Sequence, residues 1–178
     1  MAQSILIIAA HPAYHKSRAN RALRFAAANM ANVTVHDLYE TYPDLLIDVA
    51  REQEILVKHQ HIVMLHPLYW YSSPAIIKEW QDLVLEYGWA YGEGGTFLNG
   101  ITWTQAITAG APEDAYMPKG RNRFSIDELL RPFEATAHLC GCLWQPPFVL
   151  PSSREASPAA LMQHGHDFRA MLEGLTNG

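Results

Sequence analysis

Two polar side chains near the start of the chain could help to hold a phosphate. Ser17 and Asn20 lie where a helix should begin, so their hydroxyl and amide groups join the free backbone N–H groups of a helix N-terminus. Lys16 and Arg18 add positive charge nearby. A plain helix cap at Ser17 explains the local sequence equally well. The position of this segment directly after the first predicted strand favours the phosphate site.

Three consecutive aromatic residues, Tyr69, Trp70 and Tyr71, separate a buried strand from an amphipathic helix. A connection in this place is normally short and polar, so the rings must either pack or bind something flat. They could form a subunit contact or a small surface core, or they could form the wall of a site for a planar aromatic ligand. The strand-end turn at Thr108–Gly110 would let such a ligand approach the backbone. A phosphate beside Ser17 and a ring between the other two segments describe flavin mononucleotide (FMN) or another nucleotide.

The histidines and the missing motifs argue against other chemistries. His11 and His66 each precede a proline at a strand end, where a histidine is more often packed or hydrogen-bonded than a ligand. In each of two histidine pairs, one residue separates the two histidines. This spacing does not place two metal ligands on one helix face, so no metal is expected. No G-x-G-x-x-G or G-x-S-x-G motif is present, which weakens classical dinucleotide binding and hydrolase chemistry. The two pairs are His59 with His61 and His164 with His166.

Length and composition predict one folded domain, from residue 1 to residue 178, with 49% hydrophobic and 17% charged residues. The formal net charge of −5 argues against a nucleic-acid partner. No apolar stretch approaches the roughly 20 residues that span a bilayer, and the N-terminal ILIIAA indicates a strand of the mature protein, so we expect a cytoplasmic protein. Cys140 and Cys142 are one residue apart and should be reduced and structural.

Hydrophobic periodicity predicts five strands alternating with five helices. Such alternation is typical of a doubly wound parallel sheet with helices on both faces, a three-layer α/β/α fold. The three segments His11–Asn20, Pro67–Ser73 and Thr108–Lys119 all follow strands, so they should gather at one edge, where open sheets of this kind bind ligands. The predicted strands are Ser4–Ala10, Asn32–Leu38, His61–Pro67, Ile101–Gly110 and Phe148–Leu150. The helices are about 19–30, Val49–His59, 74–87 with Ser73 as cap, Ser125–Leu139 with a kink or restart at Pro132, and Ser157–Leu175.

Five sequence blocks resemble, in order and spacing, the flavodoxin-like NAD(P)H:quinone oxidoreductases, and within that family the ancillary subunits of glutathione-gated potassium efflux systems. HPLYWYSSPAIIKEW and GWAYGEGG are specific for the broad family, while YPDLLID with REQ indicates the ancillary branch. The resemblance covers nearly the whole chain and implies a flavodoxin-like five-stranded fold. The blocks are AHPAYHKSRAN, HDLYETYPDLLIDVAREQ, HPLYWYSSPAIIKEWQDLV, GWAYGEGGTFLNG and LRPFEATAHLCG.

The resemblance implies a homodimer with one FMN per subunit, or FAD in its place, bound at a site that the partner chain helps to close. Hydride would pass from NAD(P)H through the flavin to a quinone. Relatives often have two threonines and two glycines where this chain has Thr108–Ala111. Some place a tyrosine and a histidine in the next loop, where Tyr116 matches the tyrosine and could act in catalysis, but no histidine lies among Met117–Arg123. The implied flavin contacts are His11, Ser17, Arg18, Ala19, Asn20, Leu68, Tyr69, Trp70, Tyr71, Thr108, Ala109, Gly110 and Ala111.

The resemblance leaves two functions open. The chain could be a quinone reductase that also regulates a potassium efflux transporter, held by that partner at the inner face of the cell membrane. It could instead be a regulatory subunit with little or no activity, for which the altered Thr108–Ala111 turn argues. A one-electron carrier of the flavodoxin type is disfavoured because such carriers present a strongly acidic face.

Overall fold

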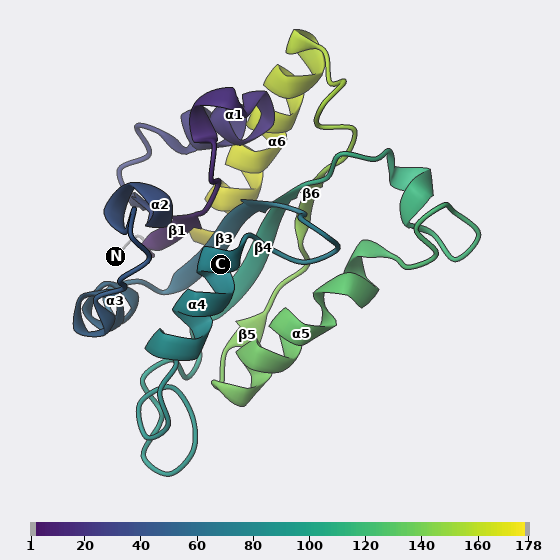
Figure 1. Cartoon of the computed structure of the whole chain (residues 1–178). Helices are drawn as coiled ribbons and strands as arrows, with labels where there is room; N and C mark the ends of the chain where they lie inside the picture. The colour runs from purple at the N-terminus through teal and green to yellow at the C-terminus, as the bar shows by residue number, and fades with distance from the viewer. Residues whose placement is uncertain (1–2, 177–178) are drawn as a thin grey trace.

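A computed structural model describes residues 3–176, and six strands within that range form one parallel sheet (Figure 1). The order is β2-β1-β3-β4-β5, and β6 also pairs with β4. This order confirms the flavodoxin-like doubly wound arrangement, because the chain reverses direction across the sheet between β1 and β3. The strands are β1 (Ile5–Ala9), β2 (Val33–Asp37), β3 (His61–Pro67), β4 (Thr102–Thr108), β5 (Leu143–Trp144) and β6 (Phe148–Leu150).

The last predicted strand is divided into two short pieces. Residues Thr102–Trp103 of β4 pair with β5, and residues Ala106–Thr108 pair with β6. Pro146 and Pro147 lie between the two pieces, and a proline cannot donate to a ladder. The sequence prediction included only Phe148–Leu150, because a two-residue strand carries no readable alternation. The sheet therefore has five positions, and β5 and β6 share the fifth.

Helices cover both faces of the sheet, as Figure 1 shows, with α1 and α6 together on one face and α3, α4 and α5 on the other. Residues alternate between the two faces along β1, where Ile5 and Ile7 pack toward α1 and α6 and Leu6 and Ile8 pack toward α4. This three-layer arrangement confirms the predicted fold class. The helices are α1 (Arg18–Ala27), α2 (Leu38–Thr41), α3 (Val49–Leu56), α4 (Ala75–Val84), α5 (Ile126–Leu139) and α6 (Pro158–Thr176), with short 3₁₀ turns η1 (Tyr14–Lys16) and η2 (Glu113–Tyr116).

The predicted limits of α4 are wrong at both ends. The N-cap is Pro74 rather than Ser73, and the Ser73 hydroxyl donates to the Pro74 carbonyl oxygen at 3.3 Å instead of capping the helix. The helix ends at Val84, which leaves Tyr87 outside it and 67% exposed. The turn between Tyr69 and Ser72, which is closed by two backbone hydrogen bonds, sets the direction in which the chain enters α4. The local cap pattern does not specify this tertiary geometry.

Pro132 does not interrupt α5, which continues as one helix from Ile126 to Leu139. The helix begins with a capping box, in which Ser125 Oγ accepts from the Glu128 backbone N–H and the Glu128 carboxylate accepts from the Ser125 backbone N–H. Six helical residues, fewer than two turns, therefore precede Pro132, and the helix continues although proline lacks one backbone donor.

A buried polar cluster holds α3 against α4 and the end of β2. The Glu52 carboxylate on α3 accepts hydrogen bonds from His36 at 2.8 Å, Tyr42 at 2.6 Å and Trp80 at 2.8 Å. Glu52 is 1% exposed and Trp80 is fully buried. A buried carboxylate is tolerated only when donors satisfy it, and here three do. The cluster thereby fixes α4, the helix that follows the aromatic turn.

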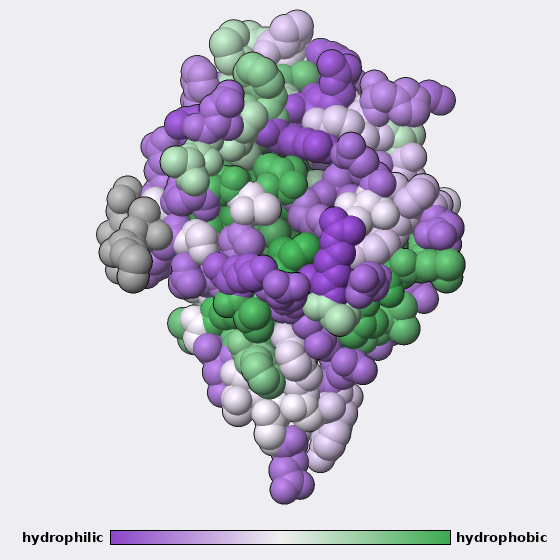
Figure 2. Space-filling model, turned by 90° about the vertical axis from the view of Figure 1, so that its left-hand side faces the viewer, coloured by the Kyte–Doolittle hydropathy of each residue, from purple (hydrophilic) through white to green (hydrophobic). Residues whose placement is uncertain are grey.

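The loop between α4 and β4 projects from the body and forms the tapered lower end of the molecule in Figure 2. The rings of Trp89 and Phe97 stack with centroids 5.6 Å apart and planes inclined by 9°. A Cβ at Gly95 would lie 2.1 Å from the Tyr91 carbonyl oxygen, so only glycine fits there. The loop is therefore shaped by its own side chains.

Candidate functional site

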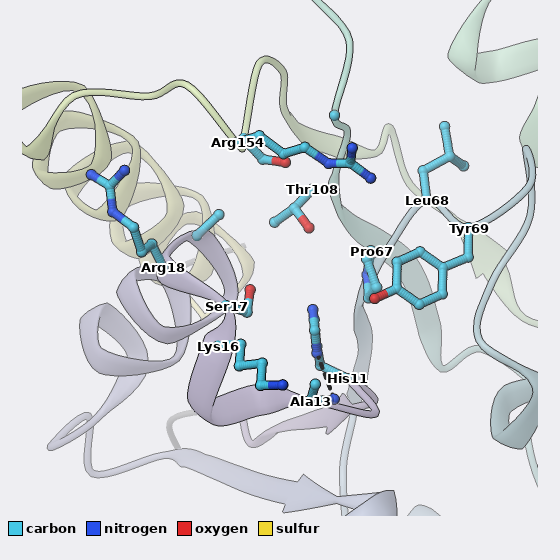
Figure 3. A pocket seen from close by; sticks show the side chains of 13 residues that line it. His11, Ala13, Lys16, Ser17, Arg18, Pro67, Leu68, Tyr69, Thr108 and Arg154 are labelled. Carbon is cyan, nitrogen blue, oxygen red and sulfur yellow. Dashed lines mark hydrogen bonds between the residues drawn. The ribbon is translucent and has the colours of Figure 1, made fainter.

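A cavity of about 410 Å³ opens at the carboxyl ends of the central strands. Its wall comes from the segment that follows β1, from residues 67–69 at the end of β3, from Thr108 and Gly110 at the end of β4, and from Ser153 and Arg154 after β6. Figure 3 shows these side chains around one hollow, although they come from four parts of the chain. The predicted gathering of strand-end loops at one edge is thus what the fold produces.

The N-terminus of α1 forms one side of this cavity. Ser17 is the N-cap, and its hydroxyl oxygen accepts from the Asn20 backbone N–H at 3.2 Å, so the capping interpretation is correct. The first N–H groups of the helix have no acceptor within α1, and Ser17, Arg18 and Ala19 line the cavity beside them. The site therefore combines a cap with backbone donors that face the cavity, and the two interpretations of Ser17 do not exclude each other.

Asn20 is 2% exposed and acts as a brace between the two loops. Its amide Nδ2 donates to Ser17 Oγ at 3.1 Å and to Thr108 Oγ1 at 2.9 Å. Its Oδ1 atom is buried and has no hydrogen-bond partner among the described residues. The structure therefore places Asn20 behind the cavity wall, where it joins the start of α1 to the end of β4.

Two other side chains of the first loop point toward the cavity centre. His11 Nδ1 accepts from the Ala13 backbone N–H at 3.0 Å, which orients the ring, and Figure 3 shows that ring directed into the hollow. Partial burial lowers the pKa of His11 below 6.5, so the ring is largely neutral at pH 7. Lys16 lies beside it. The Arg18 guanidinium points away and donates to the Ala156 carbonyl oxygen at 3.0 Å.

A second cavity of about 520 Å³ adjoins the first. The two share Leu68, Tyr69, Gly110 and Arg154, so together they form one elongated hollow. The far end of the second cavity lies between the aromatic turn and the segment that contains Tyr116. The additional wall residues there are Trp70, Tyr71, Ala111, Tyr116, Arg121 and Asn122.

The aromatic turn has an unusual backbone. Tyr69 and Ser72 exchange two backbone hydrogen bonds of 3.2 and 2.9 Å, and between them Trp70 (φ 49°) and Tyr71 (φ 64°) are in the left-handed region. Two successive bulky residues with positive φ store strain of about 1–3 kcal/mol each. The Trp70 ring is 94% exposed, so it does not pack within this chain. Of the two predicted roles for these rings, packing inside the subunit is ruled out for Trp70.

The facing turn after β4 divides its residues between the core and the cavity. Thr108 lines the first cavity and accepts from Asn20, while Ala109 is fully buried with its N–H bonded to the Leu150 carbonyl oxygen at 2.8 Å. Gly110 and Ala111 line the second cavity. The side chain of Ala109 therefore does not reach the hollow, whereas Thr108, Gly110 and Ala111 line it.

Tyr116 lies in the 3₁₀ turn η2 and is half-buried at the wall of the second cavity. Burial raises the pKa of its phenol above 10, so the group keeps its proton at neutral pH and can donate it in a hydrogen bond. Beside it, the Tyr71 hydroxyl donates to Asn122 Oδ1 at 3.4 Å, which links the aromatic turn to this segment.

Sequence reasoning missed Arg154, Arg121 and Asn122 as wall residues. Arg154 follows β6 directly, so the rule that selected the other strand-end loops would also have selected this one. Its neighbours Ser152 and Ser153 donate backbone N–H groups to the Ala111 and Ala109 carbonyl oxygens, each at 2.9 Å. The segment is thereby fastened to the turn after β4, which no local pattern indicates.

His66, the second of the two histidines that precede a proline at a predicted strand end, is buried and lies outside the cavities. Its ring bonds to the Pro67 carbonyl oxygen at 3.0 Å and to the Gln105 side chain at 2.9 Å, and burial lowers its pKa. Among residues 3–176 no group of three or more histidine, cysteine, aspartate or glutamate side chains is arranged to hold a metal ion. In the same range no helix has both the length and the apolar character needed to cross a membrane.

The strand order, the cavity at the carboxyl edge and the helix N-terminus within it define a flavodoxin-type α/β protein. A family model described as flavodoxin-like fold matches residues 3–172. The chain therefore belongs to this family of flavodoxin-like proteins.

Relatives and solved structures place the chain more closely. The glutathione-regulated potassium-efflux system ancillary protein KefG of Pectobacterium carotovorum subsp. carotovorum (strain PC1) is 50% identical over 168 residues, which are 94% of this chain and 92% of that protein. A general stress protein 14 from Treponema denticola, solved in complex with FMN, is 39% identical with a TM-score of 0.93, over 97% of this chain and 99% of that one. An NADPH-quinone reductase from P. pentosaceus is 30% identical with a TM-score of 0.87, over 94% and 96% of the two chains.

Proposed function

We propose that the protein is an FMN-dependent NAD(P)H:quinone oxidoreductase, built as one flavodoxin-like domain over residues 1–178, that also serves as the ancillary subunit of a potassium efflux transporter. The observation that carries the proposal is the elongated hollow, which has a helix N-terminus at one end and an aromatic turn at the other. A phosphorylated ligand with a flat ring system requires both features in one site.

The residues of the hollow fit FMN rather than a ligand without phosphate. Free N–H groups at the start of α1, the Ser17 hydroxyl and Lys16 supply donors and positive charge for a phosphate. Residues 68–71 and Gly110 offer a wall and exposed backbone for a ring. Ala19, Thr108 and Ala111 complete the contacts that we propose, and FAD would use the same set. When bound, the flavin supplies two-electron redox chemistry between NAD(P)H and a quinone.

The side chains would position rings and exclude water rather than act as nucleophiles. Neutral His11 carries its proton on Nε2 and can donate a hydrogen bond there, since Nδ1 accepts from the Ala13 backbone N–H. The protonated Tyr116 hydroxyl can donate to an oxygen that gains charge during the reaction. Asn20 acts from behind the wall, because it holds Ser17 and Thr108 at a fixed separation.

A homodimer would complete the site. Trp70 is 94% exposed beside the second cavity, and Tyr71 is 49% exposed, although both are held in a strained turn. Large aromatic rings at a cavity rim are typical of residues that a partner covers. Docking on a transporter at the inner face of the membrane, in a cytoplasmic protein, follows the similarity to KefG.

Steady-state oxidation of NADPH with menadione as acceptor tests the enzymatic part of the proposal. We expect turnover that is lost when FMN is removed and returns when FMN is added, and that stops when a Ser17→Asp variant places a carboxylate where the phosphate would bind. The control is Ser125→Asp, which puts the same charge at the N-cap of α5, outside the cavities. Absence of turnover in the wild type with FMN, NADH and NADPH would contradict the proposal.

The second candidate function is a regulatory subunit with little or no activity. The turn after β4 favours it, because Ala109 and Ala111 stand where related enzymes often have threonine and glycine. Co-purification with a glutathione-gated efflux transporter, carried out beside the menadione assay, separates the two. Binding without turnover would favour the regulatory subunit, and turnover without binding would remove it.

A further inference from the structure

Arg154 is a cation at the junction of the two cavities whose charge no described residue neutralises. Its side chain lines both cavities, and no ion pair or hydrogen bond joins its guanidinium to a residue within 3–176. Arg24 and Arg131, by contrast, are paired with Asp37 at 2.8 Å and with Glu134 at 2.7 Å. A guanidinium at a concave site without an acidic partner is suited to a ligand that carries negative charge.

The backbone around Arg154 is fixed relative to the turn after β4. Ser152 and Ser153 bond to the Ala111 and Ala109 carbonyl oxygens, each at 2.9 Å, so Arg154 follows two fastened residues. The guanidinium crosses directly over Gly110, where its Nε atom lies 3.5 Å from the position that a Cβ would occupy. Figure 3 shows the side chain extending from this segment across the hollow, above Thr108 and toward Leu68.

This position separates Arg154 from the proposed phosphate end of the site. The phosphate donors lie at the start of α1 with Ser17 and Lys16, and these two residues line the first cavity alone. Arg154 lies on the side that continues into the second cavity, with Gly110, Leu68 and Tyr69. A cation there faces the place for the ring rather than the place for the phosphate.

We infer that Arg154 is a positioning residue that binds the electron-rich carbonyl edge of the flavin ring and stabilises its reduced form. The inference rests on the proposed function. Reduction by two electrons leaves more negative charge on the pyrimidine side of the ring, and a fixed cation beside it binds the reduced form more tightly than the oxidised form. The loop Met117–Arg123 contains no histidine that could supply this charge. Arg154 supplies it from a different strand-end loop.

Binding and redox measurements on matched variants test the inference. Arg154→Gln removes the charge, Arg154→Lys keeps it without the planar fork, and Lys119→Gln removes an exposed cation that lines neither cavity. Dissociation constants for oxidised FMN and for riboflavin, which lacks the phosphate, are measured by fluorescence quenching, and midpoint potentials by dye-coupled titration. Arg154 is exposed, so equal thermal midpoints should show that all variants fold.

We expect Arg154→Gln to weaken FMN and riboflavin binding by similar factors. We expect it to weaken binding of the reduced form by about tenfold more than the oxidised form, which lowers the midpoint potential by about 30 mV. Arg154→Lys should retain most of the wild-type potential, and Lys119→Gln should match the wild type.

Three results would overturn the inference. Weaker binding of FMN with unchanged riboflavin binding and unchanged potential would make Arg154 a phosphate ligand. Wild-type affinities and potential in Arg154→Gln would remove it from the site while leaving the proposed function intact. A wild-type protein that binds neither flavin would refute the proposed function itself, and the inference with it.

Discussion

Replacement of Glu52 by glutamine tests whether the buried polar cluster holds the helix behind the site. One carboxylate oxygen accepts from His36 and Tyr42, and the other accepts from Trp80. Glutamine has one acceptor oxygen, so one end of its amide must present N–H groups to a donor. The variant removes the buried carboxylate charge and leaves one of the three donors without an acceptor. Together these changes should lower the free energy of unfolding by about 3 kcal/mol.

Urea unfolding followed by far-UV circular dichroism at neutral pH measures this loss. The matched control is Glu54→Gln on the same helix, where the exposed carboxylate pairs with Lys58 at 2.7 Å. Exposed pairs of this kind contribute little, so the control should unfold close to the wild type. Equal losses in the two variants would refute the reasoning.

The same cluster predicts a pH dependence. Burial by itself would raise the pKa of Glu52, but the hydrogen bonds from His36, Tyr42 and Trp80 outweigh it and hold this pKa below 4.5. A carboxyl group with a lowered folded-state pKa contributes stability above its unfolded pKa and loses it as the pH falls through the folded value. Wild-type stability should therefore fall more steeply below about pH 4.5 than that of Glu52→Gln. An equal fall in stability with decreasing pH in the wild type and in Glu52→Gln would contradict this prediction.

The remaining predictions concern the cap, the aromatic turn and the thiols. Ser17→Ala should lower the free energy of unfolding by about 1 kcal/mol in urea titrations, because the Asn20 backbone N–H loses the Ser17 hydroxyl as its acceptor; unchanged stability would argue against the cap. Trp70→Ala should change stability by less than about 0.5 kcal/mol, because the ring is 94% exposed, yet weaken self-association in sedimentation equilibrium; the reverse pattern would place the ring in the core. Burial raises the pKa of the Cys140 thiol and raises that of Cys142 to about 12, so both should react with a disulfide reagent far more slowly in the native protein than in urea; equal rates would show that neither is buried.

Most of the sheet was predictable because its central strands are buried on both faces. The apolar runs at Ile5–Ala9 and His61–Pro67 need no partner to be recognised, and parallel pairing follows from the helices between them. The fifth position was predictable only in part. Its pieces are two and three residues long, and pairing with β4 rather than any local pattern makes them strands.

The cap predictions differ for a physical reason. Ser17 and Ser73 both precede a helix, and each has the composition of an N-cap. Ser17 is free to turn toward Asn20, whereas Ser73 is followed by Pro74, which takes the cap position with an extended backbone (φ −56°, ψ 148°). The closed turn between Tyr69 and Ser72 sets this arrangement, and the exchange of hydrogen bonds across it depends on the folded chain.

Strand order and periodicity alone predict the candidate site as a set of loops, and only the resemblance implied the individual flavin contacts. Strand ends gather at one edge in any doubly wound sheet, so the segments at His11, Leu68 and Thr108 could be selected in advance. Which side chains face the hollow depends on packing: Asn20 turns inward as a brace, while Arg154 reaches in from the loop after β6, which no local pattern marks.

Flavin content after gentle purification tests the central claim most directly. The account predicts one FMN per chain, visible as an absorbance band near ~450 nm and restored by added FMN after removal. Protein that carries no flavin and gains none when FMN or FAD is added would contradict it.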